Sequence, residues 1–137
     1  MTRDHLGTAR SVAVVGSTGS IGTQTLEVIA ASGGRYRVEA LAAATSAETL
    51  AEQAQRWKPR LVAIADETAA ADLRRQVPTG VEVVAGSDAL AQVAESADVC
   101  VNGVVGFAGL PVTLAALAAG RRLALANKES LIAAGPL

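Results

Sequence analysis

The chain has 137 residues, with 12 basic and 13 acidic side chains and a formal net charge of −1 at pH 7. This length predicts a single domain, and the balanced charge argues against binding to nucleic acid or to an anionic membrane. No apolar run reaches the roughly 18 residues of a membrane span, and residues 1–10 lack the apolar segment of a signal peptide. We therefore expect a cytoplasmic protein. The single cysteine, Cys100, excludes an internal disulfide, and the apolar run around it predicts a buried, unreactive thiol.

Strand-like and helix-like segments alternate along the chain. Half of the residues are hydrophobic, yet Phe, Trp and Tyr occur once each. The core must therefore consist of Ala, Val, Leu and Ile, which suit parallel strands that are buried on both faces. The alternation predicts an α/β fold: a doubly wound parallel sheet of about six strands, in three layers, with right-handed crossovers. The predicted strands are Ser11–Val15, Tyr36–Ala43, Leu61–Ala65, Val81–Ala85, Val99–Asn102 and Arg122–Ala126.

Four segments between these strands place apolar side chains at helical spacing, which predicts amphipathic helices. Trp57 lies on one of these apolar faces, so we expect it to pack in the core rather than stack on a ligand. The predicted faces are Ile21, Thr25, Val28 and Ile29; Leu50, Ala51, Ala54 and Trp57; Leu90, Val93, Ala94 and Ala97; and Leu110, Leu114, Leu117 and Ala118.

A glycine-rich turn joins the first predicted strand to the first predicted helix. It reads Gly16-Ser-Thr-Gly-Ser-Ile-Gly22. A strand, a glycine turn and a helix start in this order bind the diphosphate of a dinucleotide in α/β sheets. The glycines allow close approach, and the free helix N–H groups favour negative charge. Ser17, Thr18 and Ser20 add hydroxyl donors. The alternative is a glycine-rich connector that binds nothing.

The end of the second predicted strand bears on which dinucleotide binds. Sites for NAD usually carry Asp or Glu here, to bind the ribose 2′-hydroxyl, whereas this chain has Ala44, Thr45 and Ser46. A 2′-phosphate would meet no carboxylate at this point, and the two hydroxyls can donate to it, although no arginine is present. In the alternative interpretation, Ser46 only caps the helix that starts near Ala47.

Two further segments follow predicted strands at the sheet edge where ligands bind. Asn127 can bind an amide-like ring substituent or ribose, Lys128 can hold a substrate phosphate or carboxylate, and Glu129 can accept from ribose or carboxamide. Alternatively, Asn127 caps the final helix and its two charged neighbours are solvated. The loop 102–110 carries three glycines, which would let backbone lie against a flat ring or would only serve the entry into a helix.

Together these motifs resemble the N-terminal domain of the 1-deoxy-D-xylulose 5-phosphate reductoisomerase family. The resemblance rests on residues 16–22, the glycine loop 102–110 and Leu125-Ala-Asn-Lys-Glu-Ser-Leu131, and it runs from about Ser11 to the end of the chain. It implies a Rossmann-like NADPH-binding domain over residues 11–137, behind a flexible arm of residues 1–10. The family converts 1-deoxy-D-xylulose 5-phosphate to 2-C-methyl-D-erythritol 4-phosphate in the non-mevalonate pathway of isoprenoid synthesis.

The resemblance also implies roles for individual residues. Gly16 and residues 18–21 (Thr18, Gly19, Ser20 and Ile21) would contact the cofactor phosphates, and Ala44, Thr45 and Ser46 would lie at its 2′-phosphate. Asn127 and Glu129 would lie on the nicotinamide side, and Lys128 would touch the sugar-phosphate substrate. The family commonly has glycine at the position of Ala44, basic or amide residues at those of Thr45 and Ser46, and a larger small residue at that of Gly103.

The family binds Mg²⁺ or Mn²⁺ through one Asp and two Glu of a following domain and forms homodimers. We therefore expect these 137 residues to contain no catalytic residue and no metal ligand. We expect the fragment to bind the cofactor without catalysing turnover, and it can be monomeric. Two alternatives remain: the NADP-binding domain of another two-domain dehydrogenase, such as one acting on a semialdehyde, and a dinucleotide-sensing module without catalysis.

Overall fold

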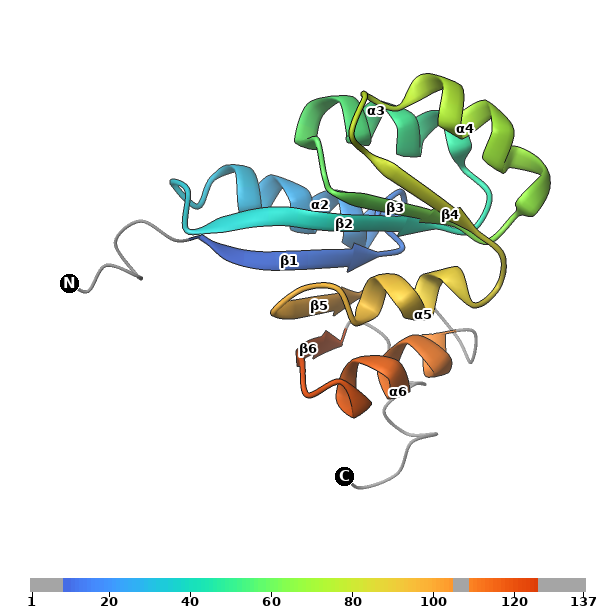
Figure 1. Ribbon diagram of the computed structural model, residues 1–137. Helices are drawn as coiled ribbons and strands as arrows, with labels where there is room; N and C mark the ends of the chain where they lie inside the picture. Colours follow the sequence, from blue (N-terminus) through green and yellow to red (C-terminus); the bar gives the residue numbers. More distant parts are fainter. Residues whose placement is uncertain (1–8, 105–108, 126–137) are drawn as a thin grey trace.

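The computed structural model describes residues 9–104 and 109–125. In these ranges six strands form one sheet, all pairs parallel, in the order β4-β3-β2-β1-β5-β6 (Figure 1). The strands are β1 (Arg10–Val15), β2 (Tyr36–Ala43), β3 (Leu61–Ile64), β4 (Glu82–Ala85), β5 (Val99–Asn102) and β6 (Arg122–Leu125). The helices are α2 (Ser20–Ala30), α3 (Ala47–Trp57), a 3₁₀ turn η1 (Glu67–Ala69), α4 (Ala70–Gln76), α5 (Ala89–Ala94) and α6 (Leu110–Ala118). The predicted α/β fold with a six-stranded, doubly wound parallel sheet is confirmed.

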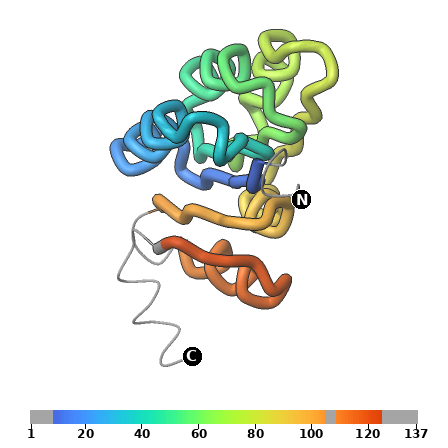
Figure 2. Tube along the Cα trace, turned by 90° about the vertical axis from the view of Figure 1, so that its left-hand side faces the viewer, coloured from blue at the N-terminus to red at the C-terminus, as the bar shows by residue number. Residues whose placement is uncertain are grey.

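The helices cover both faces of the sheet, which gives three layers (Figures 1 and 2). Successive residues of a strand point to opposite faces, and the two core clusters follow this alternation. Val12 and Val14 of β1 pack with α2, α3 and α4, whereas Ala13 and Val15 pack with α5 and α6. Nearly every position of β1 and β3 is therefore buried on one face or the other.

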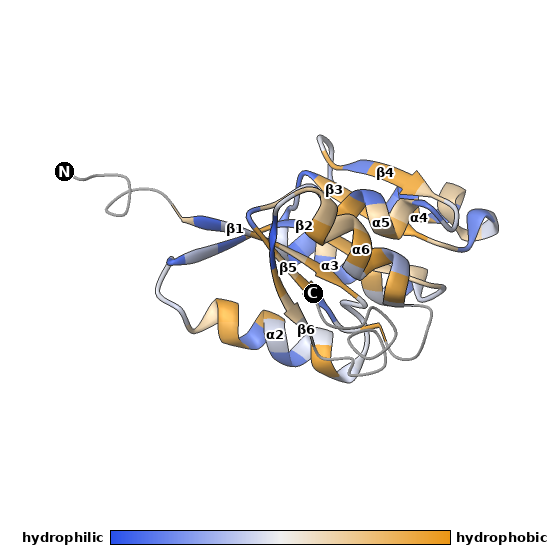
Figure 3. Ribbon diagram, turned by 90° about the horizontal axis from the view of Figure 1, so that it is seen from below, coloured by the Kyte–Doolittle hydropathy of each residue, from blue (hydrophilic) through white to orange (hydrophobic). Residues whose placement is uncertain are grey.

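The strand ends differ in polarity. Figure 3 shows that the first residues of β1 and β2 are hydrophilic, whereas the later residues of both strands are mostly hydrophobic. Ser11 of β1 and Asp98, directly before β5, are linked there: the backbone N–H of Asp98 donates to the Ser11 hydroxyl oxygen at 2.9 Å, and the backbone N–H of Ser11 donates to the Asp98 carboxylate at 3.4 Å. The polar first residues of β1, β2, β4 and β6 thus lie at the amino-end edge of the sheet, outside the apolar core.

Strand β2 contains an extra residue opposite β1. Val12 pairs with Val38 but Ala13 pairs with Ala40, so Glu39 has no partner on β1. The Glu39 carboxylate, which is 12% exposed, instead accepts from Arg60 at 2.6 Å and from Arg37. Because the two arginines outweigh the effect of burial, the pKa of Glu39 is lowered.

The predicted strands agree with the structure to within one residue at each end that it describes. Two predicted helix faces are wrong in part. On α2, Val28 is 67% exposed and Ile21 is also exposed, while Gly22, Leu26 and Ile29 are buried.

On α6, the predicted Leu114 and Leu117 are exposed, and the buried face is Val112, Thr113 and Ala116. Both helices are apolar on more than one side, so periodicity alone did not identify the side that meets the sheet. The face of α3 is confirmed: Leu50, Ala51 and Ala54 are buried, and Trp57 packs against them. Within the described residues, no helix is long and apolar enough to cross a membrane.

Candidate functional site

The candidate site lies at the point where the direction of winding changes. From β1 the chain proceeds through β2, β3 and β4 on one side, and β5 and β6 lie on the other side of β1. The carboxyl ends of β1 and β5 are therefore neighbours whose following segments diverge, which opens a crevice for ligands in doubly wound sheets. The N–H of Gly103, after β5, donates to the oxygen of Val15, the last residue of β1, at 2.8 Å.

The turn after β1 is held by hydrogen bonds to β2. Both Gly16 and Ser17 donate from the backbone to the Ala42 oxygen, at 2.8 and 3.0 Å, and Gly19 donates to the Gly16 oxygen at 3.2 Å. Helix α2 begins directly after this closed turn, at Ser20. The position of the helix start is thus fixed relative to the sheet.

Two of the three glycines are required by the protein itself. Gly16 has φ of +80°, and a Cβ there would lie 3.1 Å from the carbonyl carbon of Gly103 and 3.2 Å from the nitrogen of Val104. At Gly22 a Cβ would lie 2.2 Å from the Gly16 oxygen, so only glycine allows α2 to pack this closely on the turn. These contacts bring three backbone segments together at the crevice.

Gly19 differs from the other two glycines. Its backbone is extended (φ −82°, ψ 179°), and among residues 9–104 and 109–125 a Cβ would meet only the Gly16 oxygen, at an ordinary 3.6 Å. Neither strain nor packing against these described residues requires glycine at this exposed position. A glycine here lets a ligand phosphate approach the backbone at the helix start.

The first turn of α2 has free hydrogen-bond donors. The first helical bond of α2 runs from Thr23 N–H to the Gly19 oxygen, and the N–H groups of Ser20, Ile21 and Gly22 meet no acceptor among residues 9–104 and 109–125. No side chain caps the helix, and its first turn has no acidic residue. These donors and the helix dipole favour an anion at this position, by about 0.3–1 kcal/mol at an exposed site.

The predicted phosphate-turn residues lie together around these donors. Gly19, Ser20 and Ile21 are exposed and Thr18 is partly buried. The Ser17 hydroxyl, expected as a further donor to a ligand, is not available: Ser17 is fully buried and its hydroxyl donates to Gln53 of α3 at 2.8 Å. Sequence reasoning missed Gln53, because its partner lies 36 residues away and no local pattern marks it.

The predicted 2′-phosphate loop lies at the carboxyl end of β2. Ala44, Thr45 and Ser46 are all exposed, and α3 begins after Ser46 as predicted. Ser46 occupies the N-cap position, but its side chain makes no capping hydrogen bond. The alternative in which Ser46 only caps the helix is therefore not supported by the hydrogen bonding.

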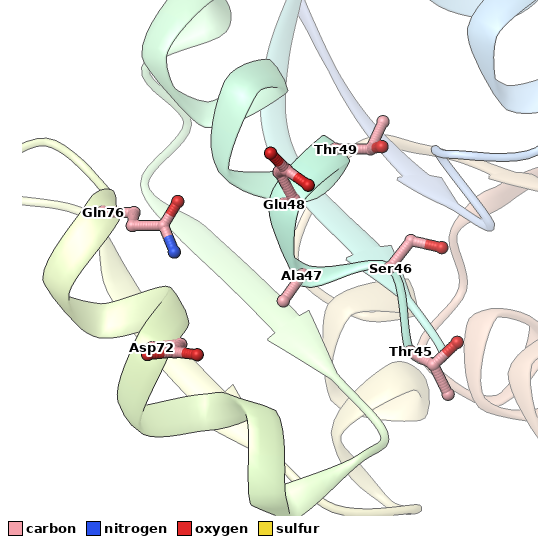
Figure 4. A pocket seen from close by; sticks show the side chains of 7 residues that line it. All are labelled: Thr45, Ser46, Ala47, Glu48, Thr49, Asp72 and Gln76. Carbon is pink, nitrogen blue, oxygen red and sulfur yellow. The ribbon is translucent and has the colours of Figure 1, made fainter.

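A pocket of about 540 Å³ lies beside this loop, between the start of α3 and α4 (Figure 4). Hydroxyls, an amide and two carboxylates line it, and no basic side chain does so. The lining residues are Thr45, Ser46, Ala47, Glu48, Thr49, Asp72 and Gln76. A phosphate at the Thr45–Ser46 end would therefore depend on neutral donors.

The segment after β5 is organised by Asn102, which is fully buried. Its Nδ2 donates to the Gly109 oxygen at 2.9 Å and to the Thr113 hydroxyl at 3.0 Å, and its Oδ1 accepts from the Val104 N–H at 3.1 Å. One amide thus links the end of β5 to the start of α6. It also keeps Val104 beside Gly16.

Some predicted residues lie outside the part of the chain that the structure describes. These are the middle of the glycine loop (residues 105–108) and the cluster Asn127, Lys128 and Glu129. Within the described residues, no group of three or more His, Cys, Asp or Glu side chains is arranged to hold a metal ion. Cys100 is fully buried, and burial raises the pKa of its thiol to about 12, so the predicted buried thiol is confirmed.

Comparisons of this chain with known proteins all point to the same enzyme family. The family model for 1-deoxy-D-xylulose 5-phosphate reductoisomerase matches residues 12–135. The reductoisomerase of Moorella thermoacetica is 48% identical over 94% of this chain, and that of Caulobacter vibrioides is 49% identical over 96% of it. The chain spans about a third of the length of these relatives (34% and 33%).

Solved structures agree with the sequence matches. The reductoisomerase from Zymomonas mobilis in complex with NADPH superposes with a TM-score of 0.87 at 43% identity, over 93% of this chain and 34% of that one. A reductoisomerase in complex with NADPH, fosmidomycin and magnesium gives a TM-score of 0.84 at 36% identity, over 90% of this chain and 31% of that one. The chain belongs to the 1-deoxy-D-xylulose 5-phosphate reductoisomerase family.

Proposed function

We propose that this chain is the NADPH-binding part of a reductoisomerase that converts 1-deoxy-D-xylulose 5-phosphate to 2-C-methyl-D-erythritol 4-phosphate. The observation that carries the proposal is the set of free N–H groups at the start of α2, behind a glycine turn at the switch point of the sheet. Relatives solved with NADPH support the choice of cofactor. The proposal concerns the whole protein, of which this chain corresponds to about a third of its relatives' length.

The diphosphate of NADPH would lie against the turn after β1. Its oxygens would accept from the N–H groups of Ser20 and Ile21 and from the hydroxyls of Thr18 and Ser20, and Gly16 and Gly19 would allow the approach. The fit would be steric as well as electrostatic, because a side chain at Gly19 would stand in front of the helix start, where its Cβ meets only the Gly16 oxygen among the described residues. A dinucleotide at this position would explain the glycine, which packing against the described residues does not require.

The adenosine end of NADPH would lie at the carboxyl end of β2. Ala44 leaves room there, and the hydroxyls of Thr45 and Ser46 would donate to the 2′-phosphate. The unused Ser46 hydroxyl supports this role, since it makes no bond to the protein within the described residues. The neighbouring carboxylates of Glu48 and Asp72 would weaken, rather than strengthen, the preference for the charged 2′-phosphate.

The residues proposed for the reacting end of the site are assigned from the family relationship. Asn127 and Glu129 would hold the nicotinamide side and Lys128 the sugar-phosphate substrate. NADPH, when bound, supplies the hydride for the reduction, and a divalent metal held by another part of the protein would polarise the substrate oxygens. A solved relative with magnesium supports the metal. A cytoplasmic location and a homodimer of the whole protein stay predictions from the sequence.

The test is calorimetric titration of this chain with NADPH and NADH. We expect NADPH to bind more tightly than NADH, and Gly19→Val to lower NADPH affinity by at least about tenfold, because its side chain would occupy the phosphate space. The extended backbone of Gly19 tolerates valine, so the variant should stay folded. Ala31→Val, at the exposed far end of α2, is the control and should bind as the wild type does.

Two results would contradict the proposal. The first is no detectable NADPH binding by the folded wild-type chain. The second is binding of both cofactors that Gly19→Val leaves unchanged, since the ligand would then lie away from the turn after β1.

A further inference from the structure

Gln53 and Ser17 make a reciprocal pair of hydrogen bonds between α3 and the turn after β1. The Ser17 hydroxyl donates to Gln53 Oε1 at 2.8 Å, and Gln53 Nε2 donates to the Ser17 backbone oxygen at 2.9 Å. Ser17 is fully buried and Gln53 is partly buried. The two residues therefore bond to each other with little competition from water.

These bonds complete the anchoring of Ser17. Its N–H already donates to the Ala42 oxygen on β2, so its N–H, hydroxyl and carbonyl groups are each engaged by other elements. Ser17 lies between Gly16 and Thr18, directly before the residues that form the proposed phosphate contacts. The side chain of Gln53 on α3 thus holds the Ser17–Thr18 peptide through the Ser17 carbonyl oxygen.

Helix α3 also begins at the second proposed phosphate position. Ser46 is the residue directly before α3, and Gln53 lies about two helical turns further along the chain. Ser46 lies at the proposed 2′-phosphate position, and Gln53 contacts the proposed diphosphate turn. Helix α3 therefore connects the two phosphate-binding segments, although its own core face of Leu50, Ala51 and Ala54 packs in the interior.

We propose that Gln53 is a positioning residue for the cofactor diphosphate: it orients the Ser17–Thr18 peptide so that the amides after it face the ligand. The inference rests on the proposed function, because it needs NADPH at this turn. In this role Gln53 acts through Ser17, to which its amide oxygen and one amide N–H are bonded. Losing the pair would let the turn adopt other orientations and would reduce the population able to bind.

The test compares two glutamines of α3. Gln53→Leu removes both bonds to Ser17, and we expect the dissociation constant for NADPH to rise by about tenfold, which corresponds to about 1.4 kcal/mol. Gln55→Leu is the matched control, because Gln55 also donates from the same helix to a backbone oxygen, that of Gln76, but on the far side from the turn. This variant should bind NADPH as the wild type does. Binding is measured at a temperature where circular dichroism shows all variants folded.

Two further variants keep the proposal testable if Gln53→Leu folds poorly. Gln53→Glu retains an acceptor for the Ser17 hydroxyl but places a carboxylate oxygen against the Ser17 carbonyl, so it should weaken binding at pH 8 at least as much as leucine does. Ser17→Ala removes one bond of the pair and should weaken binding by about threefold. When Ser17→Ala and Gln53→Leu are combined, the two losses of NADPH affinity should not add, because each single change already disrupts the same pair of hydrogen bonds.

A spectroscopic measurement separates positioning from general stability. In ¹⁵N–¹H spectra of the free chain, Gln53→Leu should shift or broaden the amide signals of residues 16–20, whereas Gln55→Leu should leave them in place. Unchanged NADPH affinity in Gln53→Leu, or equal losses in both leucine variants, would overturn the inference while leaving the proposed function intact. Absence of NADPH binding by the wild type would instead overturn the proposed function.

Discussion

Replacing Gly22 by alanine tests the packing on which the site depends. Alanine favours a helix over glycine by about 1 kcal/mol, so an isolated helix would gain from the change. In this fold, however, the new Cβ would lie 2.2 Å from the Gly16 oxygen and 2.5 Å from the Ser17 Cα. Both are backbone atoms, so α2 and the turn must separate by about 1 Å to reach an ordinary contact of 3.4 Å.

The two effects have opposite signs, and the steric one is larger. Overpacking of this kind costs about 1–3 kcal/mol, and we expect the upper end because no flexible side chain can yield. Subtracting the helix gain leaves a net loss of about 2 kcal/mol in the free energy of unfolding. Separation of α2 from the turn should also misplace the free amides, so NADPH affinity should fall together with stability.

Urea unfolding followed by circular dichroism measures the first effect, and calorimetric titration with NADPH measures the second. Gly19→Ala is the matched control in the same turn: its Cβ would lie at 3.6 Å from the Gly16 oxygen on an extended backbone, so stability should change by less than about 1 kcal/mol. A Gly22→Ala variant that is as stable as the wild type would refute the steric reasoning. Normal NADPH affinity in that variant would show that the turn does not need this packing.

Three other predictions concern side chains that are buried or partly buried, namely Cys100, Glu39 and Asn102. Cys100, with its thiol pKa raised to about 12 by burial, should react with DTNB at pH 8 only after unfolding; rapid labelling of the native chain would contradict its burial. Burial raises the pKa of Glu39, but the hydrogen bonds from Arg60 and Arg37 outweigh this and lower it from 4.5. The ionised Glu39 carboxylate therefore stabilises the fold above about pH 5, and this contribution is lost as pH falls through the lowered pKa of Glu39. Glu39→Gln should destabilise by about 1 kcal/mol at pH 7 and by less at pH 3 in urea unfolding, and an equal loss at both values would exclude the ion pairs as the cause. Asn102→Leu should cost about 2–3 kcal/mol, because it removes two buried hydrogen bonds and one partly buried one; a loss below about 0.5 kcal/mol would show that the segment after β5 does not depend on them.

The strand pattern and the glycine turn could be predicted because their signals are local. Short β-branched runs between helical segments predict parallel strands wherever they occur, and β2 and β5 have the predicted bounds. The turn Gly16–Gly22 was predicted as a phosphate site from its spacing after β1. Its position at the switch point then follows from the sheet order.

The faces of α2 and α6 could not be predicted in the same way. Both helices carry more apolar residues than one face can bury, so Val28 and Leu114 fit a helical period and are nevertheless exposed. Only tertiary packing selects the buried side of each helix, which carries Gly22, Leu26 and Ile29 on α2 and Val112, Thr113 and Ala116 on α6. Gly22 and Thr113 are buried without an apolar side chain, so apolar periodicity cannot identify the sides that carry them.

The amino-acid sequence by itself determined the α/β fold class, the strand segments and the position of the glycine turn after β1, because each depends on the chemistry of neighbouring residues. The tertiary structure decided what the individual turn residues do. It assigned Gly16 and Gly22 to backbone contacts, left Gly19 without close backbone contacts among the described residues, and paired the Ser17 hydroxyl with Gln53. The contact of Gly16 with Gly103 and the pairing of Ser17 with Gln53 join segments far apart in the chain that meet only when the sheet forms, so local sequence carries no signal for them.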